Sequence, residues 1–298
     1  MKILVSGSTG LIGRALVSHL RDAGHEVTRL VRPGSPDSAD GIEWDPANRL
    51  LDPNDVEGFD AVVHLAGESI NQRWTDATKE RILQSRVQGT ELLAGTLADL
   101  DEPPEVLVSA SAVGYYGDRG DEWLPEDADA GDLFISDVCQ QWEAASQAAT
   151  ENGVRVVNIR TGVVLSDEGG ALPQMLPPFK LGLGGKLGSG DQFVPWVARE
   201  DVVEAIAFLL AHEALSGPVN VCAPNPVRNT ELTDTLGDVL GRPTVFFVPR
   251  FGIRLLFGQM GEELLLASDR VRPAKLADAG FEWEYEELNP ALEHALSD

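Results

Sequence analysis

The sequence predicts an α/β protein built on a doubly wound parallel sheet. Strand patterns alternate with helical patterns from the start of the chain: a strand at Lys2–Ser6, a helix at 11–23 and a strand at Glu26–Val31. A glycine-rich turn joins the first strand to the first helix. Strands that alternate with helices connect by right-handed crossovers, which place the strands parallel and the helices on both faces of the sheet.

The same alternation continues through the first half of the chain. We expect further strands at 60–66, 106–109, 154–160 and 219–222, and further helices at 76–100, 134–152 and 201–211. After Arg160 the pattern loosens, because prolines and a glycine-rich stretch interrupt any long helix. We therefore assign 1–165 and about 194–224 to a core domain, and 166–193 with 225–298 to a small C-terminal α/β lobe that carries the substrate.

Composition limits the class of protein. The chain has 298 residues, of which 43% are hydrophobic, and this is enough for a large core. No apolar run approaches the roughly 18 residues of a membrane span, and the first strand begins at Lys2 without a cleavable leader pattern. Cys139 and Cys222 have neither disulfide nor metal spacing. We expect a cytoplasmic protein with no metal site and no membrane partner.

Charge is the unusual feature of the composition. The 48 acidic residues against 23 basic ones leave a formal net charge of −25, spread along the whole chain. Such a field repels nucleic acid, so a nucleic-acid partner is disfavoured. Scattered carboxylates with scarce lysine favour a salt-rich cytoplasm, where a Debye length of about 3 Å at about 1 M screens the self-repulsion. The alternative is an ordinary acidic protein.

The glycine-rich turn gives the strongest signal of a binding site. Its three glycines are spaced as in a Rossmann-type fold: one permits the tight turn, one lets the backbone approach a diphosphate, and one lets the helix pack on the sheet. Free N–H groups at the helix N-terminus then face the diphosphate. We predict dinucleotide binding by Gly7, Ser8, Thr9, Gly10, Leu11, Ile12 and Gly13. The alternative is a turn with a purely structural role.

The end of the second strand favours NADP(H) over NAD(H). Sites specific for NAD place an Asp or Glu there to bond the ribose 2′-hydroxyl. This chain has Val31 and then Arg32. Val31 cannot make that bond, whereas Arg32 can pair with a 2′-phosphate. An arginine at a strand end is otherwise a solvated surface residue.

Further motifs follow in order along the chain. They are His-Leu-Ala-Gly-Glu-Ser-Ile from residue 64, Ser-Ala-Val-Gly-Tyr-Tyr-Gly-Asp from 111, Arg-Thr-Gly-Val-Val-Leu from 160, Pro-Val-Arg-Asn from 226 and Arg-Val-Arg-Pro-Ala-Lys-Leu from 270. With the glycine turn, they make the chain resemble the extended short-chain dehydrogenase/reductase family, of the sugar-nucleotide epimerase/dehydratase type. The chain is most similar to its uncharacterised "epimerase family" branch, which has its own C-terminal domain.

The resemblance implies a cofactor across the carboxyl ends of the strands and a substrate cleft under the C-terminal lobe. By matching position, it places Leu65, Ala66 and Gly67 along the adenosine half of the cofactor. It also places Ser109 and Ser111 near the nicotinamide, with Val163 and Val164 closing over it. His64 lies within an apolar strand pattern, so we interpret it as a buried, hydrogen-bonded histidine rather than a base.

The family's proton relay is missing from this sequence. Relatives use a Tyr with a Lys four residues later, whose charge lowers the Tyr pKa and holds the cofactor ribose. The three tyrosines here, Tyr115, Tyr116 and Tyr285, are followed at that spacing by Arg119, Gly120 and Asn289. In the helix that should carry the pair, Ile135 takes the Tyr position and Cys139 the Lys position.

Two hypotheses remain for the function. In the first, the chain is an atypical oxidoreductase or epimerase-like enzyme acting on a carbonyl or sugar-nucleotide-like substrate. Ser111 then polarises a substrate oxygen, Tyr115 or Tyr116 donates the proton, Glu68 is an acid or base, and Arg86 supplies positive charge near the nicotinamide. Each of these residues could equally have a purely structural role. In the second hypothesis, the chain binds NADP(H) without turnover, as a regulatory or redox-sensing module.

Three weaker signals remain. Arginines at 228, 250, 254, 270 and 272 could favour an anionic substrate, although solvated or ion-paired arginine is the default. The long helices at 76–100 and 134–152 resemble the dimer interface of many relatives, so a homodimer is one expectation. Asp201 opens a helix, and we interpret it as a helix N-cap.

Overall fold

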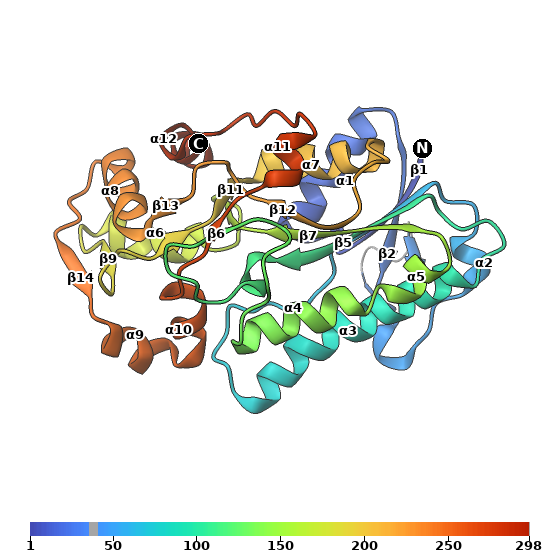
Figure 1. Ribbon diagram of the computed structural model, residues 1–298, viewed down its shortest axis with the longest axis horizontal. Helices are drawn as coiled ribbons and strands as arrows, with labels where there is room; N and C mark the ends of the chain where they lie inside the picture. The colour runs from blue at the N-terminus through green and yellow to red at the C-terminus, as the bar shows by residue number, and fades with distance from the viewer. Residues whose placement is uncertain (36–40, 298) are drawn as a thin grey trace.

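The computed structural model describes residues 1–35 and 41–297 (Figure 1). A seven-stranded sheet forms its centre, in the order β12-β7-β5-β4-β1-β2-β3, and every neighbouring pair is parallel. The strands are β1 (Lys2–Ser6), β2 (Glu26–Val31), β3 (Gly41–Glu43), β4 (Ala61–His64), β5 (Val106–Ala112), β7 (Arg155–Thr161) and β12 (Gly217–Val221). The strand order reverses between β1 and β4, and ligands of such sheets bind at this switch point.

Helices cover both faces of the sheet, as the predicted α/β fold requires (Figure 1). One face carries α1 (Leu11–Asp22) and α7 (Arg199–Ala211), and the other carries α2 (Pro53–Val56), α3 (Asp76–Ala98), α4 (Phe134–Ala144) and α5 (Gln147–Glu151). Side chains alternate along β1 accordingly: Ile3 and Val5 pack toward α1 and α7, whereas Leu4 packs with Leu93 and Leu97 of α3. The predicted doubly wound sheet is thereby confirmed.

Most of the shorter elements gather at the end of the molecule away from the N-terminus, whereas residues 274–278 pack on the central sheet beside α7 (Figure 1). The helices are α6 (Leu172–Lys180), α8 (Asn229–Leu240), α9 (Arg250–Phe257), α10 (Gln259–Leu265), α11 (Ala274–Asp278) and α12 (Leu288–Leu296). The strands pair as β6 (Trp123–Leu124) with β15 (Arg270–Val271), β8 (Val163–Leu165) with β11 (Trp196–Ala198), β9 (Gly185–Leu187) with β14 (Phe246–Val248), and β10 (Phe193–Val194) with β13 (Val227–Arg228). A separate apolar core joins α6, α8 and α12.

Three local predictions were wrong. The helix predicted at 134–152 is divided into α4 and α5, and at the break the Ser146 hydroxyl donates a hydrogen bond to the Glu143 carbonyl. The strand predicted at 60–66 ends at His64, because the next two N–H groups turn toward the Ser6 hydroxyl. Asp201 is not an N-cap: α7 begins after Ala198, and the Asp201 carboxylate lies within its first turn.

Within the described residues, no helix combines the length and the apolar character needed to cross a bilayer. The same part of the chain holds no cluster of three or more His, Cys, Asp or Glu side chains arranged to bind a metal ion. Both cysteines are buried and free.

Candidate functional site: the carboxyl edge of the sheet

The turn after β1 requires glycine at two of its three positions. Gly7 has a φ of +68°, and a Cβ there would lie 2.6 Å from the backbone carbon of Leu65 in the neighbouring loop. A Cβ on Gly13 would lie 2.2 Å from the Gly7 carbonyl oxygen, so only glycine lets α1 pack this closely on the turn.

Gly10 plays a different role in the turn. It is exposed, and the single atom within reach of an added Cβ is the Gly7 carbonyl oxygen, at 3.2 Å. It is also the N-cap of α1 and has no side chain to satisfy the first N–H groups of the helix. Leu11 and Ile12 follow, half-buried, with Ser8 buried and Thr9 exposed beside them. The turn is thus open to an anion along its backbone amides.

Arg32 lies at the same edge of the sheet as the glycine turn. In the parallel register Ser6 pairs with Leu30, so Arg32 comes just beyond the level of Gly7 on the neighbouring strand. Its side chain is exposed, and among the described residues it makes neither a hydrogen bond nor an ion pair. Val31 before it is buried.

His64 ends β4 as a buried, neutral side chain. Its Nδ1 lies 2.6 Å from Ser6 Oγ, and that hydroxyl also accepts the N–H groups of Leu65 and Ala66. Burial lowers the pKa of His64 to about 4, so the ring is uncharged near neutral pH. The interpretation of His64 as a hydrogen-bonded structural residue is confirmed, and its bonds fix the path of residues 65–67.

Arg86 places a buried cation beneath the loop that follows β4. It projects from α3, is 9% exposed, and donates from one terminal nitrogen to the carbonyls of Glu68 (3.0 Å) and Ile82 (3.1 Å). Its guanidinium also lies over the Trp142 ring. A Cβ on Gly67 would lie 3.5 Å from the guanidinium carbon. Burial lowers the pKa of Arg86, and within the described residues no carboxylate forms an ion pair with it.

The other predicted site residues differ in burial and in whether their polar atoms have a hydrogen-bond partner. Ser109 lies opposite the last residue of β4, His64, is fully buried, and its hydroxyl makes no hydrogen bond within the described residues. Val163 and Val164 of β8 are half-buried, and the loop after them reaches Leu11 at the start of α1. The Glu68 carboxylate accepts a hydrogen bond from the Gln72 amide at 3.2 Å.

Ser111 belongs to a buried ionic network that the sequence analysis missed. Ser111 pairs with Arg160 across β5 and β7, and both side chains point to α4. The Ser111 hydroxyl donates to Glu143 Oε1 at 2.7 Å, and two guanidinium nitrogens of Arg160 donate to the two Glu143 oxygens at 2.8 Å each. Burial alone lowers the pKa of Arg160, but its bonds to Glu143 and Tyr116 outweigh this and raise it.

The two adjacent tyrosines have different environments. Tyr116 is fully buried, and its hydroxyl donates to Asn220 Oδ1 at 2.7 Å and accepts from Arg160 at 3.0 Å. Burial raises its pKa. Tyr115 is half-buried, with the Arg160 guanidinium 3.4 Å from its ring centre. Tyr116 therefore has no surface to offer a substrate in this conformation, whereas Tyr115 has some.

Apolar packing fills the positions where relatives carry the Tyr and Lys pair. Ile135 and Cys139 are both almost fully buried on α4. Burial raises the pKa of the Cys139 thiol to about 12, so it is neither a charge nor a proton donor near neutral pH.

The C-terminal tail is joined to the core by part-buried hydrogen bonds to the carboxylates of Glu126 and Asp201. Glu126 Oε1 accepts the backbone N–H of Asn220 and of Lys275, each at 3.1 Å. Asp201 accepts the N–H groups of Glu284 and Tyr285 at 2.7 and 3.1 Å, and burial raises its pKa to about 6. The sequence analysis assigned no role to Glu126 or Asn220.

Most of the arginines of the tail form ion pairs or stacking contacts within the chain. Arg228 pairs with Asp121 at 2.9 Å, and Arg254 pairs with Glu262. Arg270 stacks on the rings of Trp123 and Phe193. These contacts use three of the five arginines that suggested an anionic substrate.

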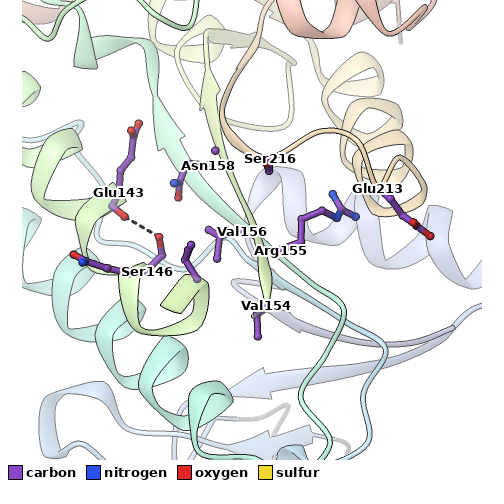
Figure 2. Close-up of a pocket in the computed structure, with 11 residues that line it drawn as sticks. Glu143, Ser146, Val154, Arg155, Val156, Asn158, Glu213 and Ser216 are labelled. Atoms are coloured by element: carbon purple, nitrogen blue, oxygen red, sulfur yellow. Dashed lines mark hydrogen bonds between the residues drawn. The ribbon is translucent and has the colours of Figure 1, made fainter. Parts of the chain in front are cut away.

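A hollow of about 620 Å³ lies on the α5 side of β7 and contains none of the predicted site residues (Figure 2). It is lined by Glu143, Ser146, Gln147, Thr150, Val154, Arg155, Val156, Asn158, Glu213, Ser216 and Gly217. Figure 2 shows the hydrogen bond from Ser146 to the Glu143 carbonyl along its wall. Arg155 donates to backbone carbonyls of the chain, so it is not free to bind an anion here.

Comparison with known proteins identifies the family of the chain that carries this site. The model of the NAD dependent epimerase/dehydratase family matches residues 3–222, and a domain of unknown function (DUF1731) matches residues 248–295. An epimerase family protein of Mycobacterium bovis is 42% identical over 99% of this chain and 97% of its own length.

Solved structures agree with these matches. The crystal structure of human epimerase family protein SDR39U1 (isoform 2) with NADPH superposes with a TM-score of 0.89 at 36% identity, covering 99% of each chain. A nucleoside-diphosphate sugar epimerase from Corynebacterium glutamicum superposes with a TM-score of 0.83 at 38% identity, covering 99% of this chain and 58% of that one. None of these relatives bears on the salt-rich habitat, which stays a prediction. The chain belongs to the NAD-dependent epimerase/dehydratase family.

Proposed function

We propose that this chain binds NADP(H) along the carboxyl edge of the sheet and acts as an atypical oxidoreductase or epimerase-like enzyme. The observation that carries the cofactor preference is Arg32, an exposed cation beside the glycine turn where an NAD site would have a carboxylate. The human relative crystallised with NADPH supports the same preference. We further propose a carbonyl or sugar-nucleotide-like substrate.

Three features of the structure fit a dinucleotide. Gly10 leaves the amides of the α1 N-terminus open to a diphosphate. Arg86 is a buried cation below Gly67 without a carboxylate partner among the described residues, and bound phosphate or ribose oxygens would compensate it. The buried Ser109 hydroxyl lacks a hydrogen bond within the described chain and could donate to a carboxamide. A bound nicotinamide would supply or accept hydride.

The chain's own groups suggest how a substrate oxygen would be held. The Ser111 proton is directed to Glu143, so in this conformation Ser111 cannot donate to a substrate oxygen as the sequence analysis expected. Its free lone pairs are left to accept a hydrogen bond from a substrate hydroxyl. Arg160 holds Glu143 with two hydrogen bonds and thereby positions Ser111. Of the two tyrosines, Tyr115 is the better candidate for proton transfer, because Tyr116 is fully buried.

A second candidate function is binding of NADP(H) without turnover. The observation that favours it is the replacement of the proton relay by Ile135 and the neutral Cys139 thiol. In that case the cofactor would stabilise the fold by mass action, and its redox state would be the signal. Cytoplasmic location and homodimer formation remain predictions under either function.

Titration of NADPH and NADH by fluorescence tests the cofactor proposal. We expect Arg32→Ala to weaken NADPH binding by about tenfold, the value of one charge-assisted contact, and to leave NADH unchanged. Arg49→Ala is the matched control, because Arg49 is also an exposed arginine near the β2–β3 edge and pairs with Glu91. Equal affinities for the two cofactors, unaffected by Arg32→Ala, would rule out the preference.

Absorbance at the nicotinamide band across a panel of carbonyl compounds separates the two functions. An enzyme gives turnover with at least one compound, and Ser111→Ala then lowers kcat. Tight NADPH binding without turnover across the panel would favour the binding module. Unchanged rates in Ser111→Ala would remove Ser111 from the mechanism.

A further inference from the structure

Nine of the twelve exposed large apolar side chains of the described residues lie on β14, α9 and the turn before β9. We call this surface the apolar tip, and it consists of Leu181, Leu183, Val245, Phe246, Phe247, Phe251, Leu255, Leu256 and Phe257. Outside it, the exposed large apolar side chains of the described residues are Met1, Leu50 and Trp123. Contiguous exposed apolar surface of this kind marks a binding surface.

The tip is continuous in space although two segments of the chain build it. Strands β9 and β14 pair in parallel, with Lys186 opposite Phe247. A Cβ on Gly188 would lie 3.3 Å from Arg250 Cγ, so the end of β9 also adjoins the start of α9. Helix α9 is held to the protein mainly by Ile253, which is fully buried, while Phe251 and Leu255 are 75% and 76% exposed. Figure 1 shows β14 and α9 at the extremity of the molecule away from the N-terminus.

The two segments that build the tip carry positive charge, whereas the chain as a whole is strongly negative. Acidic residues number 48 in the whole sequence, yet residues 169–190 and 239–261 contain none. The same segments carry five cations, Lys180, Lys186, Arg242, Arg250 and Arg254, all of them exposed. Arg254 pairs with Glu262, whereas the other four form no ion pair within the described residues.

From this combination we propose that the apolar tip docks on an anionic phospholipid bilayer surface, contrary to the expectation from composition of no membrane partner. Phenylalanine and leucine side chains enter the boundary between headgroups and acyl chains, and surrounding lysine and arginine side chains pair with phosphate. Such docking requires no spanning helix. It makes the protein a peripheral rather than an integral membrane protein.

Two observations favour a bilayer over a protein partner. The run from Val245 to Phe257 contains no Ser, Thr, Asn, Gln, Asp or Glu, whereas protein interfaces carry about one hydrogen bond per 100–200 Å². A second copy of the chain, joined tip to tip by a two-fold axis, would place the unpaired cations of one copy against those of the other. Anionic headgroups match both the apolar character and the charge.

Co-sedimentation of the purified full-length protein with lipid vesicles tests the proposal. The vesicles are phosphatidylcholine alone and an equimolar mixture of phosphatidylcholine and phosphatidylglycerol. A protein of net charge −25 should avoid the anionic vesicles unless a local cationic surface orients it. We expect stronger binding to the mixture, and weaker binding as salt is raised.

Matched variants locate the surface. Leu255→Asp removes one apolar anchor and should weaken binding to the mixed vesicles by about tenfold or more. Leu50→Asp makes the same change at a leucine that is 61% exposed outside the tip, and should have little effect. Arg250→Gln should weaken binding to the mixed vesicles by about fivefold and leave phosphatidylcholine binding unchanged. Thermal unfolding of each variant should match the parent, because these side chains are exposed.

Three results would overturn the proposal. The first is failure of the parent protein to bind the mixed vesicles more tightly than phosphatidylcholine alone. The second is an equal loss of binding in Leu50→Asp and Leu255→Asp. The third is self-association in sedimentation velocity that Leu255→Asp abolishes, without vesicle binding, because a second copy would then be the occupant.

Discussion

The glycine turn and the α4 region both border the carboxyl end of the sheet, and they differ in how their polar groups are satisfied. At the turn, the α1 N-terminus has no side-chain cap, and the Arg32 side chain makes no hydrogen bond or ion pair among the described residues. At α4, Ser111 and Arg160 both donate hydrogen bonds to the Glu143 carboxylate. Polar groups of the first region are thus unpaired within the described residues, whereas those of the second pair with each other.

Whether a polar group is already paired affects its ability to transfer a proton as well as its ability to bind a ligand. A group that already has hydrogen-bond partners must give one up, or share it, before it can act on a substrate. The α4 region therefore holds its geometry without a ligand, and its donors are already used within the protein. Cofactor binding at the turn accordingly has stronger structural support than proton transfer at α4. Substitutions in the two regions should therefore differ in whether they change stability or ligand affinity.

Glu143→Ala should have the largest effect on stability. It leaves the Arg160 guanidinium buried without its counter-charge, which costs about 3–5 kcal/mol. The control is Glu122→Ala, which breaks the Arg119–Glu122 pair at the surface and should cost at most about 1 kcal/mol. Urea unfolding measures both. Equal losses would mean that the α4 network does not stabilise the fold more than a surface ion pair does.

Glycine substitutions separate packing from ligand binding at the turn. Gly13→Ala brings a Cβ to 2.2 Å from the Gly7 carbonyl, and should destabilise the protein by about 1–3 kcal/mol. Gly10→Ala meets the same oxygen at 3.2 Å, so it should fold with a smaller loss. Its methyl group would nevertheless obstruct a diphosphate and weaken NADPH binding by about tenfold.

Thermal melts and NADPH titration of both variants check this prediction. Full NADPH affinity in Gly10→Ala would contradict the placement of the diphosphate at the turn. Full stability in Gly13→Ala would show that α1 can shift away from the turn, and that the close contact is not required.

The core and the geometry of the glycine turn could be predicted well from the sequence, for physical reasons, whereas cofactor binding at the turn stays a prediction. Alternating strands and helices restrict the topology, and three glycines at this spacing between a strand and a helix are typical of a dinucleotide-binding turn. The buried character of His64 followed from its apolar neighbours. These inferences depend on local patterns, which a single sequence displays directly.

The ionic network could not be found in the same way, because its members come from distant segments. Arg160 lies within an apolar strand pattern, and an arginine there requires a buried counter-charge. The sequence therefore indicated that a partner exists, but not that it is Glu143, since the register of β5 with β7 and the position of α4 decide this. The break between α4 and α5 was missed because Ser146 fits a helix by composition, and its bond to Glu143 is a local competitor.

Asp201 gives the contact between α7 and residues 284–285 a pH dependence. Burial raises its folded-state pKa to about 6, above the roughly 3.9 of an unfolded chain. The stability that this group contributes is therefore fully present below about pH 4, and is lost as the pH rises through 6. Between about pH 4 and pH 6, we expect the free energy of unfolding of the parent to fall by on the order of 2 kcal/mol relative to that of Asp201→Asn. Urea unfolding of both proteins at several pH values measures it, and a parent that gains stability over the variant as the pH rises would have the wrong sign.

Tyr116→Phe should have the smallest effect, and it distinguishes the two tyrosines. Loss of the hydroxyl leaves Asn220 and Arg160 each without one hydrogen bond, which costs about 1–2 kcal/mol in urea unfolding. NADPH affinity and any turnover should be unchanged, because the side chain is fully buried. Tyr115→Phe should show the converse. Its unfolding free energy should stay within about 0.5 kcal/mol of the parent, because the Tyr115 hydroxyl makes no hydrogen bond within the described residues. Turnover should fall if Tyr115 transfers the proton. Lost turnover in Tyr116→Phe with normal stability would instead mean that the buried hydroxyl becomes accessible when the substrate binds.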